Sequence, residues 1–247
     1  SVPPLTGEAK KGITERTVYF KKKENNPMHN ITIDPNLKQV WPKAMLGCVR
    51  CRVQVEPSGE KLLAEIAGVE TWLQSTLKIE EIKTREQIAQ TRACCRALGK
   101  DVQRYRNSAE AMHRRILQGK GLYQINNVVD TGNLISIKTG YSLGAYDVEK
   151  LEGDILWTAT GEGVHYQGIG KDAVNIEFLP VLRDALGYFG NPNSDSTRAM
   201  ITDKTTEILL CIYSFSGAGG LQQALDGVCR ALAAYCQAQD LQAWVVE

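Results

Sequence analysis

Residues 125–147, INNVVDTGNLISIKTGYSLGAYD, place hydrogen-bonding side chains in an otherwise apolar stretch. Asn126, Asp130, Asn133 and Tyr146 supply the amide, carboxylate and phenol groups that could orient a polar ligand. The same kinds of side chain also bond backbone N–H groups and fix turns. The residue types therefore leave two interpretations open: a turn held by side chains, or a pocket lined by them.

A second polar group of residues lies in NPNSDSTRAM, residues 191–200. Ser194, Asp195 and Ser196 offer oxygen atoms, and Arg198 could pair with a carboxylate or a phosphate through two parallel hydrogen bonds. A polar surface loop explains the same composition. Both interpretations of this loop stay open.

Cys48 and Cys51 form a Cys-x-x-Cys pair within a predicted strand at residues 45–55. Residues three apart on a strand point to opposite faces, so one metal ion could bind both thiols only if the strand bent sharply. No second Cys/His pair follows at zinc spacing. We predict a structural role and no cofactor. The chain has seven cysteines, and we expect reduced thiols and a cytoplasmic protein.

The segment Gly217-Ala218-Gly219-Gly220 lies between a predicted strand and a predicted helix. Such a turn could hold a phosphate at the helix N-terminus. The segment lacks the lysine and hydroxyl residue of a P-loop and the spacing of a dinucleotide fingerprint. The pattern favours a tight turn that starts a helix.

The 247 residues carry a net charge of +1, so contact with nucleic acid would need a local basic patch. No apolar run reaches the length of roughly 18 residues that would span a membrane, and we expect no membrane association. No apolar signal-peptide region is visible either. Residues 1–27 are predicted to be a disordered or non-native lead, since Met28 follows, and residues 28–247 one domain. The lysines at 21–23 are typical of a solvated tail, although an RNA-contacting arm is the alternative.

The spacing of apolar residues predicts three helices in the first half of the chain. They cover residues 58–77 with Ser58 as N-cap, residues 80–98 before Gly99, and a third helix capped by Asn107. Glu110 would complete a capping box with Asn107. We expect His113 to lie on the surface of this third helix.

The second half is predicted to contain strands and one helix. GYSLG at residues 140–144 is interpreted as a hairpin, GEGVHYQGIG as a turn-rich hairpin, and GDILWTAT and EILLCIYSF as strands. A helix at residues 221–236 precedes a closing strand in AWVVE. Helices come first and strands later, which favours a mixed α+β fold.

The stretch INNVVDTGNLISIKTGYSLGAYDVEKLEGDI resembles the B3/B4 domain of the bacterial phenylalanyl-tRNA synthetase beta chain. The blocks RYRNSAEAMHRRIL and SDSTRAMITDKTTEILLCIYSF are similar to free-standing members of that family. The resemblance runs over about residues 104–228. It implies a three-layer fold containing a β-sandwich, and an activity that hydrolyses tyrosine wrongly attached to phenylalanine tRNA.

The family's editing pocket uses a Thr-Asn pair, a histidine, a glycine and a glutamate. Carried over by position, the resemblance retains Asn133 and matches the pocket glycine with Gly187. The threonine position is Gly132, the histidine position Gly144 and the glutamate position about Cys211. A pocket that recognises a hydroxyl group needs polar partners for it, and these substitutions remove most of them. We therefore expect a cavity near Gly144, opposite Asp130 and Asn133, with altered specificity.

Two classes of function follow from this resemblance. The first is a B3/B4-like protein that binds aminoacyl-tRNA, RNA or an amino-acid-like ligand, with hydrolysis of mischarged tRNA in trans as its enzymatic form. The second is a non-catalytic module that binds a small molecule or nucleic acid and has lost the editing reaction. The candidate ligand-binding residues are Asn126, Asn133, Gly144, Tyr146, Gly187, Ser196, Arg198 and Cys211.

Overall fold

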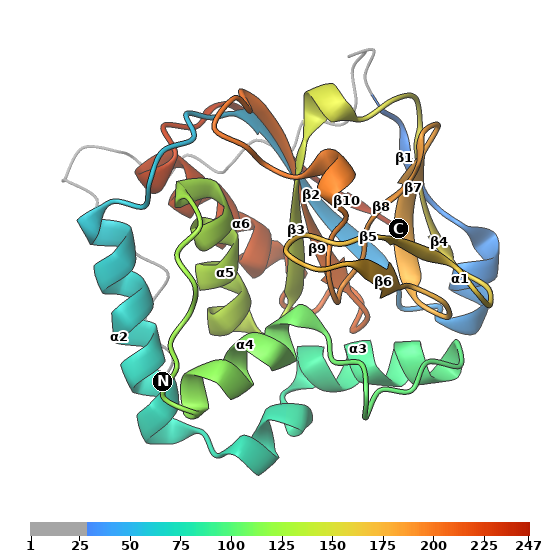
Figure 1. The fold of residues 1–247 in the computed structure, drawn as a ribbon, viewed down its shortest axis with the longest axis horizontal. Coiled ribbons are helices and arrows are strands. Elements are labelled where there is room, and N and C mark those ends of the chain that lie inside the picture. The colour runs from blue at the N-terminus through green and yellow to red at the C-terminus, as the bar shows by residue number, and fades with distance from the viewer. Residues whose placement is uncertain (1–28) are drawn as a thin grey trace.

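Two four-stranded sheets pack face to face in the computed structural model, which describes residues 29–247 (Figure 1). The predicted lead at residues 1–27 lies outside these residues. The first sheet has the order β1 (Ile31–Ile33), β4 (Ile155–Ala159), β7 (Pro180–Asp184) and β8 (Gly187–Gly190). The second has the order β10 (Gln239–Val246), β2 (Met45–Arg52), β9 (Glu207–Ser214) and β3 (Ser142–Asp147).

Two apolar cores lie on the two faces of the second sheet. The core between the sheets includes Trp157 from the first sheet and Tyr213 from the second. The other core is covered by the helices α5 (Asn127–Thr139) and α6 (Leu221–Tyr235). This arrangement of sheet, sheet and helix layer confirms the predicted α+β class.

The remaining helices extend the helical layer and border the sheets. Three α-helices and one 3-10 helix run along the outside of the molecule: α2 (Glu60–Thr76), η1 (Ile79–Thr84), α3 (Glu86–Ala97) and α4 (Ser108–Leu117). The short elements are α1 (Pro35–Val40), η2 (Val148–Lys150), η3 (Thr197–Ala199) and the separate hairpin of β5 (His165–Gln167) and β6 (Ala173–Asn175).

The strongly patterned elements form where the sequence predicts them. Strands β2 and β9, helix α6 and the closing strand β10 all occur within a few residues of the predicted bounds. The glycine segment before α6 is a turn, and Gly220 at its end has a φ of 78° and caps the helix. The interpretation of residues 140–144 as a hairpin is wrong, because Gly140 ends α5 with a φ of 85° and β3 begins two residues later.

Some predicted caps have other roles. Helix α2 begins after Gly59, and the Ser58 hydroxyl donates instead to Asp130 Oδ2 at 2.6 Å. Asn107 does cap α4 by accepting from the N–H of Glu110 at 2.9 Å. The carboxylate of Glu110 does not return to the cap, because it forms ion pairs with arginines, so the capping-box prediction is wrong.

The helix predicted over residues 80–98 is interrupted at Arg85, which adopts extended backbone angles between η1 and α3. Its guanidinium donates to the carbonyl of Lys138 at the end of α5 and lies 2.5 Å from Nε2 of His113. His113 is fully buried, which corrects the predicted surface position. Its Nδ1 is 2.7 Å from the carbonyl of Ala109, so Nδ1 is the donor and Nε2 accepts from Arg85.

Cys48 and Cys51 point to opposite faces of β2, as predicted. Cys48 belongs to the core between the sheets and Cys51 to the core under α6.

Within residues 29–247, no helix is both long and apolar enough to cross a membrane.

Candidate functional site

Tyr146 fills the space beside two glycines where the two sheets meet. Gly144 precedes it by two residues on β3, and Gly190 ends β8 in the other sheet. A Cβ atom at Gly144 would lie 1.9 Å from the Tyr146 hydroxyl, and one at Gly190 would lie 2.0 Å from it. Only glycine therefore fits at either position while the ring is in place. Phe189 packs against the phenol in an edge-on arrangement, with 4.9 Å between ring centroids.

The phenol of Tyr146 ends in a hydrogen-bonded cluster. Its hydroxyl donates to Oδ1 of Asp195 at 2.8 Å, and the hydroxyl of Tyr213 lies 2.5 Å away. Because the Tyr146 proton goes to the carboxylate, Tyr213 is the donor in the bond between the two phenols. The backbone N–H of Asn191 also donates to the same carboxylate oxygen, at 3.3 Å. The loop after β8 thus supplies the acceptor that holds the ring.

One acid of this cluster titrates near neutral pH. Burial raises the pKa of the Asp195 carboxyl to about 7, and the hydrogen bonds from Tyr146 and Asn191 offset only part of that rise. Burial, followed by the charge of Asp195, raises the pKa of both Tyr146 and Tyr213, so the two phenols stay protonated. A carboxyl group with such a pKa can exchange a proton at pH 7. Here the Tyr146 ring occupies the adjacent space that a substrate would need.

The β5–β6 hairpin covers this cluster from outside. The hydroxyl of Tyr166 in β5 donates to the carbonyl of Ser194. The N–H of Ile169, in the turn of the hairpin, donates to the carbonyl of Asp195 at 3.1 Å. The hairpin and the loop at residues 191–196 therefore close the space around the Tyr146 hydroxyl.

A model of the B3/4 domain matches residues 90–226, a span that contains Tyr146, Asp195 and both glycines. The chain belongs to the B3/4 domain family. A solved structure with a similar fold is an N-terminal fragment of the phenylalanyl-tRNA synthetase beta-subunit from Pyrococcus horikoshii. The TM-score is 0.50 at 13% identity, and the match covers 90% of this chain and 53% of that chain. This B3/4 chain thus spans about half the length of that fragment. A search of the curated proteins gave no match.

Gly144 and Cys211 of this B3/4 domain are direct neighbours. They pair in register between β3 and β9, and Cys48 pairs with Cys211 from the other side on β2. Both cysteines are fully buried in the core between the sheets. Tyr146 closes the same region, so the cavity expected at Gly144 is filled by the chain's own side chain.

Asp130 and Asn133 do not lie opposite Gly144. Both are on α5, which covers the face of the second sheet that points away from the first. Residues alternate between the faces of a strand, and Gly144 shares with Tyr146 the face between the sheets. The predicted juxtaposition across one site is therefore wrong. Asn133 is partly exposed on α5.

The other candidates on α5 stabilise local structure. The Asn126 side chain accepts from the N–H of Val129 and caps the helix. Asp130 accepts from the Ser58 hydroxyl and from the N–H of Ile125. Asp130 also lines a cavity of about 130 Å³ between α2 and the loop at residues 121–124, together with Glu70.

The candidates in the 187–198 region are likewise engaged within the protein. Arg198 donates to Asp184 at 2.8 Å and to the carbonyls of Lys150 and Gly187 at 3.0 and 3.2 Å. The Ser196 hydroxyl accepts from the N–H of Arg198. Gly187 has a φ of 122° and begins β8, directly after the turn from β7. These contacts join the β7–β8 hairpin to η2 and η3.

Three residues of the Tyr146 cluster are absent from the predicted binding set: Asp195, Gly190 and Tyr213. Asp195 was visible only as one of several polar residues in its loop. Gly190 is the second glycine of the Gly-x-x-Gly segment and ends β8, whereas the first, Gly187, begins that strand. Tyr213 is two residues from Cys211 on β9 and shares its face, a relation that alternation along the strand could have revealed.

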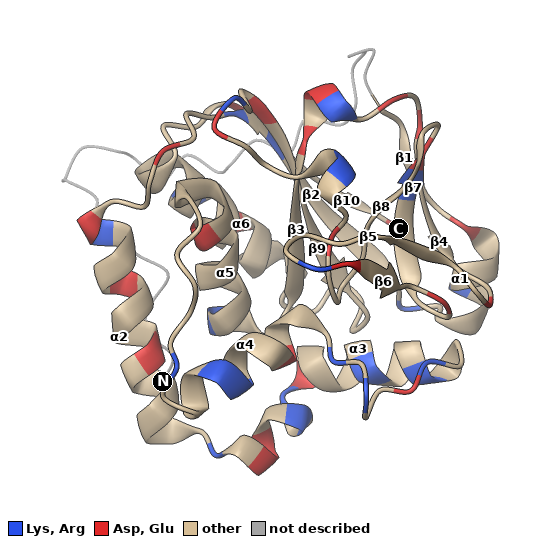
Figure 2. Ribbon diagram, in the orientation of Figure 1, with Lys and Arg blue, Asp and Glu red and all other residues tan. Residues whose placement is uncertain are grey.

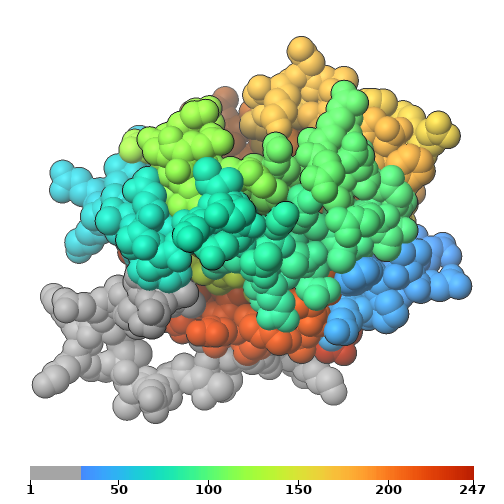
Figure 3. Space-filling view, turned by 90° about the horizontal axis from the view of Figure 1, so that it is seen from below, coloured from blue at the N-terminus to red at the C-terminus, as the bar shows by residue number. Residues whose placement is uncertain are grey.

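A basic face lies beside the loop that holds Asp195. Residues 92–120 contain eight lysines and arginines and two acidic residues, whereas the whole chain has a net charge of +1. Figure 2 shows the blue segments on α3, on α4 and on the connection between them, and Figure 3 shows that this part of the chain forms a continuous area of surface. We call this surface the basic face; its residues with exposed or partly exposed side chains are Arg92, Arg96, Arg104, Arg106, Arg114, Arg115 and Lys120.

The basic face contacts the Asp195 loop directly. The N–H of Ser108, the first residue of α4, donates to the carbonyl of Pro192 at 2.8 Å.

Among the residues that the structure describes, no group of three or more His, Cys, Asp or Glu side chains could hold a metal ion.

Proposed function

We propose that this B3/4 domain binds RNA through the basic face and does not hydrolyse an aminoacyl ester. The observation that carries the proposal is the concentration of eight basic residues against two acidic residues within residues 92–120. Phosphate contacts by lysine and arginine dominate affinity for nucleic acids, and a local patch supplies them even when the net charge is near zero. A tRNA is the partner that we favour, because the fold is shared with a synthetase subunit.

The position of Tyr146 supports binding without hydrolysis. An editing reaction needs room for the amino-acid side chain of the ester beside the reacting groups. In this chain the phenol of Tyr146 occupies the space between Gly144 and Gly190. This favours the non-catalytic module over the hydrolase.

Hydrolysis of mischarged tRNA in trans is the second candidate. Asp195 favours it, because a carboxyl group with a pKa of about 7 suits a general base or acid. This function requires Tyr146 to leave its place, so that an amino-acid-like group can reach Asp195.

We further propose that residues 28–247 act as one unit in the cytoplasm, in keeping with seven buried free thiols.

Direct binding measurements test the RNA proposal. The fluorescence anisotropy of a labelled tRNA should rise on addition of the protein, and the affinity should fall steeply between about 50 and 200 mM salt. A double charge reversal, Arg96→Glu with Arg104→Glu, should weaken binding and reduce the slope of log affinity against log salt by about 2.

The matched control is Arg183→Glu with Lys204→Glu. It makes the same change in net charge on β7 and on the loop before β9, outside the basic face. Binding should stay close to that of the unmodified protein. Equal losses of affinity in the two double variants, or no tRNA binding at low salt, would overturn the proposal.

A further inference from the structure

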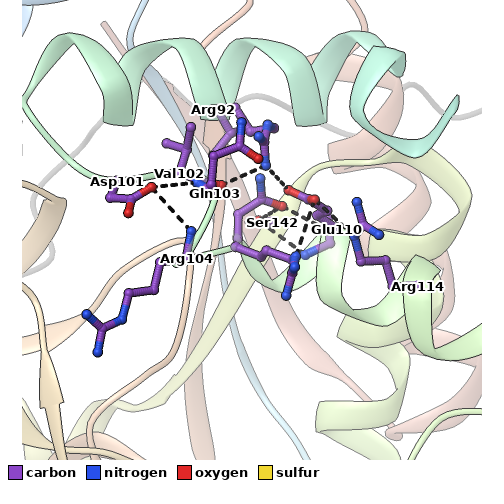
Figure 4. Close-up of polar contacts among 12 residues, drawn as sticks. Arg92, Asp101, Val102, Gln103, Arg104, Glu110, Arg114 and Ser142 are labelled. Atoms are coloured by element: carbon purple, nitrogen blue, oxygen red, sulfur yellow. Dashed lines mark hydrogen bonds and ion pairs between the residues drawn. The ribbon is translucent and has the colours of Figure 1, made fainter. Parts of the chain in front are cut away.

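Glu110 is a fully buried carboxylate surrounded by three arginines (Figure 4). Its Oε2 is 2.7 Å from Nη1 of Arg92. Its Oε1 is 3.1 Å from Nε of Arg114 and 3.8 Å from Nε of Arg106. Arg106 and Arg114 thus approach the same carboxylate oxygen through their Nε atoms. We call these four residues the arginine cluster.

The arginine cluster has more positive charge than it needs to neutralise Glu110. Three guanidinium groups and one carboxylate leave a net charge of +2. A single carboxylate accompanied by one arginine would already be paired, so the two additional cations are not explained by Glu110 alone. The excess charge is available to an anion from outside.

Donor groups of the cluster remain open at the surface. Within residues 29–247, the terminal Nη groups of Arg106 and Arg114 make no hydrogen bond, since both residues approach Glu110 only through Nε. The side chain of Arg106 is 47% exposed and that of Arg114 is 28% exposed, whereas Arg92 is 11% exposed. Arg92 therefore anchors Glu110, and the other two guanidinium groups can contact a ligand.

An unsatisfied buried donor lies at the same place. Asn107 is 3% exposed, and its Oδ1 caps α4 by accepting from the N–H of Glu110. Its Nδ2 has no hydrogen-bond partner in the described protein, and neither has the buried hydroxyl of Ser108. Buried donors without partners are costly and call for an explanation. The oxygen atoms of an anion beside these two side chains would supply partners. The first three N–H groups of α4 do not contribute, because they already bond Pro192, Ser142 and Asn107.

We infer that the arginine cluster binds a phosphomonoester at the 5′ end of an RNA strand. A phosphomonoester carries a charge of about −1.5 to −2 at pH 7, which matches the excess of +2, whereas an internal phosphodiester carries only one negative charge. The planar guanidinium forks of Arg106 and Arg114 suit the oxygen atoms of a terminal phosphate. This inference rests on the proposed RNA-binding function and assigns the strand end to a defined point on the basic face.

Arg104 provides an internal comparison. It belongs to the basic face, and its backbone N–H bonds the carboxylate of Asp101 at 3.3 Å. Its side chain extends away from Glu110 in Figure 4. Arg104 should therefore add to general attraction for RNA without distinguishing a terminal phosphate.

The test compares two oligoribonucleotides of one sequence, one with a 5′-phosphate and one with a 5′-hydroxyl group. The unmodified protein should bind the 5′-phosphorylated strand roughly tenfold more tightly, the size of effect expected of charge-assisted hydrogen bonds. The double variant Arg106→Gln with Arg114→Gln should bring the two affinities together. Arg104→Gln should weaken both strands by the same factor and leave their ratio unchanged. Circular dichroism melting establishes that each variant is folded.

A third probe separates this inference from the proposed function. Adenosine 5′-monophosphate is titrated against adenosine, with protein-observed NMR shifts of arginine Nε–H groups as the readout. Equal affinities for the two RNA strands would refute the phosphate site and leave RNA binding intact. Binding of adenosine 5′-monophosphate without binding of either RNA would retain the phosphate site and overturn the function. Absence of all binding would overturn both.

Discussion

At the scale of single residues, glycines determine where the phenol of Tyr146 can lie. Gly144 and Gly190 come from different sheets, and each lacks the Cβ atom that would collide with the same hydroxyl. The consequence is a filled site in place of an open pocket. A histidine at position 144, which the resemblance predicts for the family's pocket, would require the whole Tyr146 ring to move.

Gly144→Ala should therefore destabilise the protein by about 2 kcal/mol or more, because a close-packed core cannot absorb such an overlap. Urea unfolding measures the change. Gly68→Ala on α2 is the control, since a Cβ there meets nothing within 4 Å, and it should be neutral or slightly stabilising. In the Tyr146→Ala background the cost of Gly144→Ala should largely disappear. A cost that persists without the ring would contradict the assigned clash.

Asp195 should make the protein less stable as the pH rises. Its pKa is raised from the usual 3.8 to about 7 in the folded protein, so between these values the folded state binds more protons than the unfolded state. Stability is therefore lost as the pH increases toward and through 7. Asp195→Asn removes this dependence, and the variant should gain about 2 to 3 kcal/mol relative to the unmodified protein between pH 5 and pH 8. Urea unfolding at pH 5 and pH 8 measures the free energies of unfolding of both proteins. If the difference between the two proteins is the same at both pH values, Asp195 does not titrate in this range.

At the scale of secondary-structure elements, Arg85 explains why one predicted helix is two. It separates η1 from α3 and binds the carbonyl group of Lys138, which the end of α5 leaves without a partner. The apolar spacing of residues 80–98 fits one helix, but a tertiary contact with α5 and α4 decides the break. The same contact fixes the tautomer of His113.

His113 should make the packing of α4 against Arg85 sensitive to acid. Burial, and then the charge of Arg85, lowers the pKa of His113 from 6.5 to about 4. The unfolded state binds more protons between these values, so stability is complete above pH 6.5 and is lost as the pH falls toward 4. The full loss is about 3 kcal/mol.

Comparison with His113→Gln isolates this effect, because other titrating groups, Asp195 among them, contribute equally to both proteins. The stability of the unmodified protein relative to the variant should decrease between pH 7.5 and pH 4.5, measured by urea unfolding. A relative stability that is independent of pH would show that His113 is not buried as a neutral ring.

At the scale of the whole molecule, the β-sandwich encloses the region where the family's pocket is expected, and the basic face lies outside it. The two regions meet at Pro192 and Ser108. Binding of RNA and access to Asp195 are therefore separate properties of neighbouring surfaces. A protein with this architecture can bind RNA without giving a substrate access to Asp195.

We accordingly predict that the unmodified protein does not release tyrosine from phenylalanine tRNA mischarged with tyrosine at a useful rate. Tyr146 fills the space between Gly144 and Gly190, and positions 144 and 211 hold glycine and cysteine where the resemblance predicts histidine and glutamate. Deacylation of labelled tyrosyl-tRNA, with and without protein, is the measurement. Rapid release that depends on the protein would favour the hydrolase, and release should then change in Asp195→Asn.

The amino-acid sequence predicts the family through its resemblance to the B3/B4 domain. It also predicts the α+β class and strongly patterned elements such as β9 and α6, because apolar periodicity and local caps depend on nearby residues. It also placed Cys48 and Cys51 on opposite faces of β2, which follows from the two-residue period of a strand. Three features follow from the tertiary structure alone. Helix α5 and the Gly144 position lie on different sides of a sheet, and Glu110 forms ion pairs with three arginines. Tyr146 bonds Asp195, which is 49 residues away in the chain. These contacts depend on how the sheets and helices pack, and no local pattern in the chain encodes the distance between residues on separate elements.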